Sequence, residues 1–329
     1  MPANLTPQYL DAEKRFRQAK TPAEKISALE EMLALIPKHK GTEKMQADLK
    51  RRLSKAREEA QKKGKAGARG FTYHVPREGA GQVVLVGPPN SGKSSLLAML
   101  TNAEPEIADY PFTTRKPLPG MMEFENIKIQ LVDLPPLATA WTEGWVFALI
   151  RNADLVLVVV DLGDDDVLDQ VERVKSQLAE HKIRLVGGVA AWSPEEALAE
   201  KRALLVGNKE DLEGAKERAA LLAEFYGAEL PILTVSAASG SNLEALRRAL
   251  YDGLGVVRVY TKSPGKKPAF DAPFVLKQGA TVLDVAESVH KDIAAGLKFA
   301  KIWGVDKFDG QRVTRDYVVQ DGDVIELHS

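Results

Sequence analysis

The sequence predicts an α/β protein with a mostly parallel six-stranded sheet, a helical N-terminal arm and a small C-terminal domain. From residue 81 onward, short apolar runs alternate with segments of helical periodicity. This alternation is typical of parallel strands joined by crossover helices. The composition also changes along the chain, because residues 38–69 hold 12 Lys and Arg against 4 Asp and Glu. We therefore expect three parts, residues 1–69, 70–262 and 263–329.

The whole chain has the composition of a soluble folded protein. Its 329 residues are 44% hydrophobic and 28% charged, and this length predicts two or three domains. There is no cysteine, which excludes disulfides and thiolate metal sites. No apolar run approaches the roughly 20 residues that a membrane helix needs, and the first residues lack a signal-peptide core. We expect a cytoplasmic protein that does not contact a membrane.

The N-terminal arm is expected to contain helices. Thr21-Pro22-Ala23-Glu24 combines an N-cap, a first-turn proline and a capping-box glutamate, and Leu29 and Leu33 then fall on one face. A longer helix is expected over residues 42–63, with a narrow apolar stripe and Lys or Arg around most of the rest. This basic surface is either a solvated helix face or a nucleic-acid contact.

The predicted sheet has one hairpin among its parallel strands. At Glu125-Asn126 almost nothing separates the second strand from the third, so these two strands must be antiparallel. Before the fifth strand, Ser193-Pro194-Glu195-Glu196 predicts the start of a capped helix. The six expected strands are Gln82–Val86, Met121–Glu125, Ile127–Val132, Leu155–Val160, Ala203–Val206 and Ile232–Val235.

A glycine-rich loop follows the first strand and opens a helix. Its sequence fits G-x-x-x-x-G-K-[ST] in the required strand, loop and helix setting. The backbone N–H groups of such a loop and the helix N-terminus bind phosphate, Lys93 would reach the β- and γ-phosphates, and Ser94 would hold Mg²⁺. The alternative is a glycine turn that carries Lys-Ser by coincidence. The expected phosphate contacts are Gly87, Pro88, Pro89, Asn90, Ser91, Gly92, Lys93, Ser94 and Ser95.

The loop after the fifth strand, Asn208-Lys209-Glu210-Asp211, predicts a guanine site. A carboxylate accepts from two adjacent N–H donors, which guanine offers at N1 and N2 and adenine does not. Asn208 would join this loop to its neighbours and to the base, and the Lys209 stem would cover the ring. Ser236, Ala237 and Ala238 would face the guanine carbonyl. The alternatives are an ordinary helix cap and an ATPase in which Asp211 plays no part.

Three further residues are candidates for the metal. Asp133 ends the third strand and could hold Mg²⁺ through a water, although an Asp at that position is often only a turn residue. Thr113 and Thr114 lie in the loop between the first two strands. One of them would place its hydroxyl on Mg²⁺ and its N–H on the γ-phosphate, and Thr114 is the preferred candidate.

Together these motifs resemble a GTPase of the Obg type, and more closely the developmentally regulated GTP-binding (DRG) proteins. The resemblance covers about residues 40–329. Its C-terminal part resembles the TGS module, which implies a ubiquitin-like β-grasp that contacts RNA or a partner, or else a stabilising lid. The segments that carry the resemblance include Tyr110–Thr114, Gln130–Pro135, Arg151–Leu157, Val257–Lys262, Pro268–Pro273, Gly279–Val285 and His290–Asp292.

Independently of the resemblance, the sequence of residues 268–329 predicts a small α+β unit. Phe274–Leu276 reads as a strand, and Thr281 to His290 as a helix with Thr281 and Asp284 as cap candidates. Asp321-Gly322 is expected to turn into a last strand, Val324–Leu327.

The chain departs from the family pattern after the third strand. The family has Asp-x-Pro-Gly there, and this chain has Asp133-Leu134-Pro135-Pro136. Proline has no N–H to offer a γ-phosphate. Leu137 stands where some GTPases keep the residue that positions water. The segment between Ile183 and Leu204 is also short for the family, which implies a reduced, bacterial-type relative.

The resemblance also implies a cofactor at the fourth position of the phosphate loop. Relatives that use K⁺ during hydrolysis have an asparagine there, and Asn90 occupies that position. The alternative is that Asn90 only stabilises the loop, as asparagine does in turns.

We therefore predict a slow, Mg²⁺-dependent GTPase that converts GTP to GDP and phosphate. Lys93, Thr114 and Asn90 are its catalytic candidates, and K⁺ is a candidate cofactor. The ribosome or another RNA is the expected partner, through the helix over residues 42–63 and the TGS module. The alternative is a scaffold that binds guanine nucleotide without switching or turnover.

Overall fold

The structure is a computed structural model that divides the chain into two compact units, Met1–Thr72 and Tyr73–Ser329. The described residues of the first unit are all helical, and Leu29, Met32, Leu49 and Leu53 are buried. They agree with a helical arm, whereas the caps and ends of its expected helices lie outside the described residues. The structure describes residues 16, 29, 32, 33, 49, 51–53, 73, 75–101, 116–137, 142–188, 192, 193, 198–268 and 270–329.

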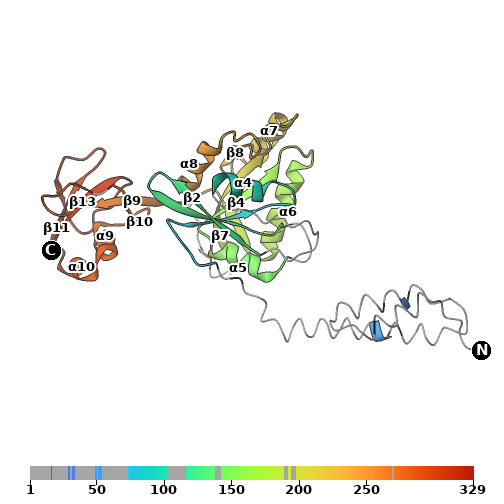
Figure 1. Cartoon of the computed structure of the whole chain (residues 1–329), viewed down its shortest axis with the longest axis horizontal. Coiled ribbons are helices and arrows are strands. Elements are labelled where there is room, and N and C mark those ends of the chain that lie inside the picture. The colour runs from blue at the N-terminus through green and yellow to red at the C-terminus, as the bar shows by residue number, and fades with distance from the viewer. Residues whose placement is uncertain are drawn as a thin grey trace, which may run out of the picture. The chain divides into compact units, whose positions relative to one another are not determined.

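The second unit begins with an eight-stranded sheet in the order β2-β3-β1-β4-β7-β5, and β6 and β8 also pair with β7 (Figure 1). The β2–β3 and β6–β7 pairs are antiparallel and the others parallel, which confirms a mostly parallel sheet with a hairpin. The strands are β1 (Gln82–Val86), β2 (Leu118–Phe124), β3 (Ile127–Asp133), β4 (Leu155–Asp161), β5 (Ile183–Val186), β6 (Trp192–Ser193), β7 (Leu198–Asn208) and β8 (Ile232–Thr234).

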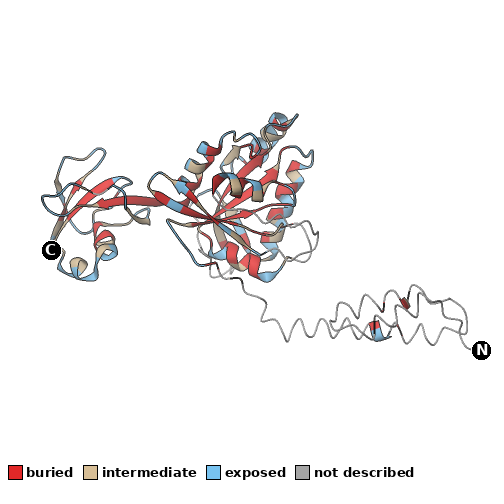
Figure 2. Ribbon diagram, viewed as in Figure 1, coloured by how far each residue is buried: buried red, intermediate tan, exposed pale blue. Residues whose placement is uncertain are grey.

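Helices cover both faces of this sheet because its apolar side chains alternate between two cores. In β1, Val84 and Val86 pack with α5, α6 and α7, whereas Val83 and Leu85 pack with α4 and α8. Figure 2 shows the buried residues following the central strands. Both faces are filled, so the carboxyl ends of the strands remain for a ligand. The helices are α4 (Lys93–Leu100), α5 (Gly144–Asn152), α6 (Val167–Glu180), α7 (Ala215–Tyr226) and α8 (Leu243–Leu254).

The sheet corrects two expectations. It has eight strands where the sequence predicted six, because β5 and β6 were missed. The helix expected to start at Ser193 is wrong, since Ser193 lies in β6 and the chain is again extended from Leu198. Residues 199–202 pair with β5 and Leu198 pairs with β6, and this pairing overrides the helical preference of the sequence Leu-Ala-Glu-Lys-Arg.

The C-terminal domain is a mixed five-stranded sheet in the order β10-β9-β13-β11-β12, with α9 packed against one face. Only the central pair, β9 and β13, is parallel. One helix against such a sheet is the predicted β-grasp arrangement. Its elements are β9 (Val256–Thr261), β10 (Phe274–Lys277), α9 (Val282–Val289), α10 (Lys291–Gly296), β11 (Phe299–Trp303), β12 (Gln311–Val313) and β13 (Asp323–His328).

The start of α9 follows the predicted cap. The Asp284 N–H donates to Thr281 Oγ1 over 3.4 Å, and the Thr281 N–H donates to Asp284 Oδ2 over 2.6 Å.

The boundary of the C-terminal domain differs from the expectation. β9 pairs with β10 and β13, whereas the boundary expected at residues 262–263 left this strand with the preceding domain. An apolar run does not reveal which sheet it will join.

In the part of the chain that the structure describes, no helix is long and apolar enough to cross a membrane.

Candidate functional site

The phosphate loop lies between β1 and α4, where the sequence places it. Two of its positions admit only glycine. A Cβ on Gly87 would stand 2.1 Å from the Val159 carbonyl oxygen, and one on Gly92 would stand 2.1 Å from Asn208 Nδ2. Gly92 also has a φ of 88°, in the left-handed region that glycine tolerates best. The glycines therefore let the loop lie directly against β4 and against Asn208.

Lys93 lies inside this loop. Its side chain is buried, and Nζ donates to the carbonyl oxygens of Pro88 at 2.7 Å and Gly87 at 3.2 Å. Ser91 is also buried and donates from Oγ to the Pro88 carbonyl over 3.1 Å. The loop thus holds an ammonium group at the start of α4, where the helix N-terminus favours an anion.

Ser94 and Asp133 lie together at the carboxyl edge of the sheet. The Ser94 hydroxyl donates to Asp133 Oδ2 over 2.5 Å. A hydroxyl and a carboxylate are hard oxygen ligands, and Mg²⁺ in nucleotide sites takes few such protein ligands besides phosphates and water. The described residues contain no cluster of three or more His, Cys, Asp or Glu that could hold a metal alone. This donor set fits Mg²⁺ bound together with a nucleotide.

Asn208 joins three loops. It is 1% exposed at the end of β7, its Nδ2 donates to the Ser91 carbonyl over 2.9 Å, and its Oδ1 accepts from the Ala237 N–H over 3.0 Å. The phosphate loop, the Asn208–Asp211 loop and the Ser236–Ala238 loop are therefore held by one side chain.

Replacing Asn208 by alanine is expected to lower the free energy of unfolding by about 3 kcal/mol, because two buried backbone groups lose their partners. Urea unfolding without nucleotide measures this loss. Asn152→Ala, at the exposed end of α5, is the matched control and should stay within about 0.5 kcal/mol of the wild type. A loss as small as the control's would show that the three loops are held together by other contacts.

The Asn208–Asp211 loop, here called the base loop, also presents an exposed carboxylate. Asp211 is exposed, and Lys209 binds the carboxylate of Asp161, at the end of β4. The N–H groups of Ser236 and Ala237 are used within the loops, so Ala238 carries the candidate donor to a base. Sequence analysis missed Asp161, although an Asp closing the apolar run Leu155–Val160 was a signal for this edge.

The segment after β3 is fastened to the phosphate loop. The Leu134 N–H donates to the Leu85 carbonyl over 3.3 Å, and the Leu137 N–H donates to the Gly87 carbonyl over 3.1 Å. The Leu137 side chain is fully buried among α5 and the sheet. Pro136 has no N–H, and the N–H of the next residue, Leu137, is already hydrogen-bonded to Gly87. This side of the site therefore presents no backbone donor from Pro136 or Leu137 to a phosphate.

Of the remaining candidates Asn90, Thr113 and Thr114, the structure describes only Asn90. Asn90 is exposed and has a φ of 61°, a turn conformation that asparagine adopts more readily than most residues. This conformation favours the role of Asn90 in stabilising the loop, which the sequence analysis gave as the alternative to K⁺ binding. Thr113 and Thr114 lie outside the described residues.

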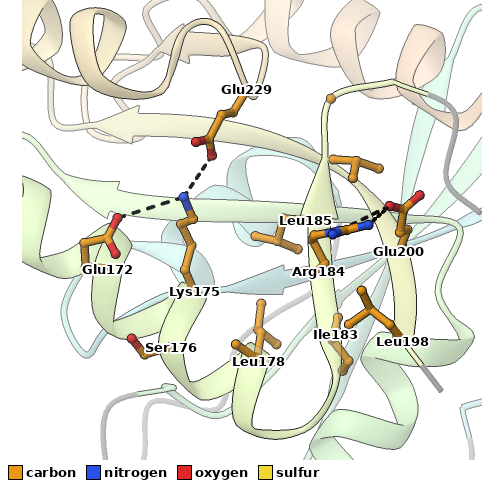
Figure 3. A pocket seen from close by; sticks show the side chains of 13 residues that line it. Glu172, Lys175, Ser176, Leu178, Ile183, Arg184, Leu185, Leu198, Glu200 and Glu229 are labelled. Carbon is orange, nitrogen blue, oxygen red and sulfur yellow. Dashed lines mark hydrogen bonds and ion pairs between the residues drawn. The ribbon is translucent and has the colours of Figure 1, made fainter. Parts of the chain in front are cut away.

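A hollow of about 720 Å³ lies away from these loops, lined mainly by α6, β5 and β7 (Figure 3). Figure 3 shows Lys175 between Glu229, at 2.9 Å, and Glu172, at 3.9 Å. Arg184 is paired with Glu200 in the same way. None of the predicted nucleotide contacts lines this hollow, and its cations already face carboxylates. We do not assign it to the nucleotide.

Comparison with known proteins agrees with this arrangement. A family model described as a 50S ribosome-binding GTPase matches residues 82–189, and a TGS domain model matches residues 257–329. An uncharacterized GTP-binding protein of Methanocaldococcus jannaschii is 32% identical, over 92% of this chain and 92% of that protein. Developmentally-regulated GTP-binding protein 2 of Homo sapiens is 28% identical, over 92% of this chain and 98% of that protein.

A solved structure, a GTP binding protein from Pyrococcus horikoshii OT3, has the same fold. Its TM-score is 0.53 at 18% sequence identity, covering 75% of this chain and 99% of that chain. The relatives from M. jannaschii and H. sapiens match this chain over nearly their whole length, and the two family models fall on the two sheets described above. The chain therefore belongs to the family of developmentally regulated GTP-binding proteins, with a GTPase domain followed by a TGS domain.

Proposed function

We propose that this protein is a Mg²⁺-dependent GTPase that hydrolyses GTP to GDP and phosphate at a slow intrinsic rate. The observation that carries the proposal is the junction at Asn208, which holds the phosphate loop against the base loop. Lys93 would bind the β- and γ-phosphates and Asp211 the guanine edge. The proposal includes the division into an arm of residues 1–69, a GTPase domain and a TGS domain.

Mg²⁺ would be held by Ser94 and, through a water, by Asp133. The 2.5 Å hydrogen bond between these two side chains supports this assignment because it places both oxygens at one point beside the phosphate loop. When bound, the ion would offset the negative charge of the phosphates. Thr114, or Thr113 in its place, would complete the set of ligands.

A slow rate follows from the segment after β3. A backbone N–H that meets the γ-phosphate lets a GTPase distinguish GTP from GDP, and Pro136 cannot supply one. Leu137 is buried and its N–H is bonded to Gly87, so the segment would have to leave the core to move. We propose that GTP and GDP bind with similar affinity.

K⁺ is proposed as the helper of hydrolysis, with Asn90 supplying an oxygen ligand. A monovalent cation held there would offset the charge that develops on the phosphates, as an arginine does in other GTPases. The partner is proposed to be the ribosome or another RNA in the cytoplasm, reached through the basic helix over residues 42–63 and the TGS domain. The ribosome-binding description of the matched family model supports this partner.

The second candidate function is a scaffold that binds guanine nucleotide without hydrolysing it. The buried, hydrogen-bonded Leu137 favours this candidate, because it ties down the segment that a switch must move. Binding to RNA or to ribosomes would then be equal with GTP and with GDP.

One experiment separates the two candidates. Affinity for labelled GTP and GDP and release of phosphate are measured with Mg²⁺, in KCl and in NaCl at equal ionic strength. We expect comparable affinities and a turnover that is faster in KCl. Equal turnover in the two salts would remove K⁺ from the proposal, and binding with no turnover in either salt would leave the scaffold. Failure to bind either nucleotide would refute both functions.

A further inference from the structure

Arg258, on β9, forms a bidentate ion pair with Asp321 inside the C-terminal domain. Its Nε lies 3.1 Å from Asp321 Oδ1 and its Nη2 lies 2.8 Å from Asp321 Oδ2, and the Arg258 backbone N–H donates to Oδ1 over 2.7 Å. The Arg258 side chain is 9% exposed. Burial acts to raise the pKa of Asp321, but the hydrogen bonds from Arg258 and Tyr251 outweigh it and hold that pKa below its ordinary value. The pair is thus charged at neutral pH.

The same two side chains contact the GTPase domain. Arg258 Nη1 donates to the Glu125 carboxylate and, over 3.3 Å, to Asn126 Oδ1, in the turn between β2 and β3. Tyr251, on α8, donates its hydroxyl to Asp321 over 2.5 Å, and the Arg258 guanidinium lies 5.0 Å from the centre of its ring. The ion pair therefore touches two elements of the preceding domain.

Asn126 adds two contacts beside this pair. Its Nδ2 donates to the Tyr260 hydroxyl over 2.5 Å and to the Phe270 carbonyl over 2.8 Å. Both partners belong to the segment that follows α8. The two residues of this turn, Glu125 and Asn126, thus bind three groups of the segment that follows α8, the Arg258 guanidinium, the Tyr260 hydroxyl and the Phe270 carbonyl.

Glu125 has a strained backbone. Its φ is 50°, in the left-handed region, where two-residue turns ordinarily have Gly, Asn or Asp. Strained residues persist where the surroundings hold them, and they gather at functional positions. Here the strained residue is the one whose carboxylate reaches Arg258. A glycine would relieve the strain but would lose the ion pair.

The other end of the β2–β3 hairpin reaches the nucleotide site. The pairing runs without interruption from Phe124 opposite Ile127, at the turn, to Leu118 opposite Asp133, which contacts Ser94. Asp133 also lies beside Leu85 of β1, just before the phosphate loop. A ladder of backbone hydrogen bonds therefore joins the Arg258 contact to the predicted metal side of the site.

We propose that the contact of Arg258 with Glu125 couples the nucleotide site to the C-terminal domain, so that nucleotide bound at one end of the hairpin stabilises the C-terminal sheet at the other. The inference rests on the proposed function, since it requires nucleotide binding. Glu125 and Arg258 act as positioning residues. Coupling of two sites is reciprocal, so the C-terminal domain also strengthens nucleotide binding by the same factor.

The test measures amide hydrogen exchange of β9 and β13 in the full-length protein, with and without GDP and Mg²⁺. In the wild type, GDP is expected to slow exchange in these strands by about fivefold or more, the lower end of ordinary couplings. In Glu125→Gln this slowing is lost, and the Kd for GDP rises by the factor that is lost. Glu123→Gln is the matched control, because Glu123 lies on the same hairpin and its ion pair with Lys128 is exposed. It should behave as the wild type.

A second variant separates coupling from stability. Glu125→Gly relieves the left-handed strain, so it is expected to fold at least as well as the wild type and still lose the GDP response. An unchanged GDP response in Glu125→Gly and Glu125→Gln would overturn the inference, as would GDP binding in the wild type with no change in exchange. Absence of GDP binding would instead refute the proposed function, and this inference with it.

Discussion

Replacing Lys93 by alanine is expected to lower GTP turnover by about 100-fold to 1000-fold, the usual cost of removing one group that stabilises transition-state charge. The Lys93 ammonium lies within the phosphate loop, 2.7 Å from the Pro88 carbonyl oxygen, and it is buried there. In the variant this positive charge is lost, and a water molecule that fills the space does not restore it. Release of phosphate from labelled GTP, in KCl with Mg²⁺, measures the loss.

The control for this variant is Lys128→Ala. Lys128 is an exposed lysine on β3 whose only described ion pair, with Glu123, lies at the surface. Its removal should leave turnover unchanged. A thermal melt without nucleotide checks that Lys93→Ala is folded, because loss of a buried side chain can itself destabilise. If the folded variant still turned over GTP at the wild-type rate, hydrolysis would not depend on Lys93, and its assignment as a catalytic residue would be wrong.

Replacing Asp211 by asparagine is expected to weaken GDP binding about a thousandfold. Two charge-assisted hydrogen bonds to guanine N1 and N2, at about 2 kcal/mol each, give about 4 kcal/mol. An asparagine amide can instead donate to a carbonyl at position 2 of the base, so xanthosine diphosphate should bind the variant better than GDP does. Competition against labelled GDP measures both affinities.

Glu213→Gln is the matched control for this change, since Glu213 is an exposed carboxylate two residues further along the same loop. It should bind GDP as the wild type does. ATP is included as a third competitor. Tight ATP binding that is unaffected by Asp211→Asn would point to an adenine site, and the assignment of Asp211 to guanine would be wrong.

The candidate site could be predicted because its chemistry is local in the sequence. The glycines at 87 and 92 and the Lys93-Ser94 pair follow a strand directly, and Asn208 and Asp211 do the same at another strand end. The apolar runs identified the buried strands of the GTPase domain for a similar reason: each is a continuous run of residues buried on both faces.

What could not be predicted depends on partners far away in the sequence. Residues 198–202 fit the helix expected from Ser193 onward, and only the pairing with β5 and β6 makes them a strand. Val256–Thr261 could belong to either sheet until its pairing with β13 is known. The strained turn at Glu125 is explained only by the ion pair of its carboxylate with Arg258. Arg258 is in turn held by Asp321, 63 residues further along the chain.

The position of β13 has a consequence for the order in which the protein folds during synthesis. Every strand of the GTPase domain has been made by Thr234, and its last helix ends at Leu254. The C-terminal sheet has β13, Asp323–His328, at its centre, between β9 and β11. Domains generally fold as units as they leave the ribosome. The GTPase domain can therefore become compact while the C-terminal sheet still lacks its middle strand, and contacts such as Arg258 with Asp321 form last.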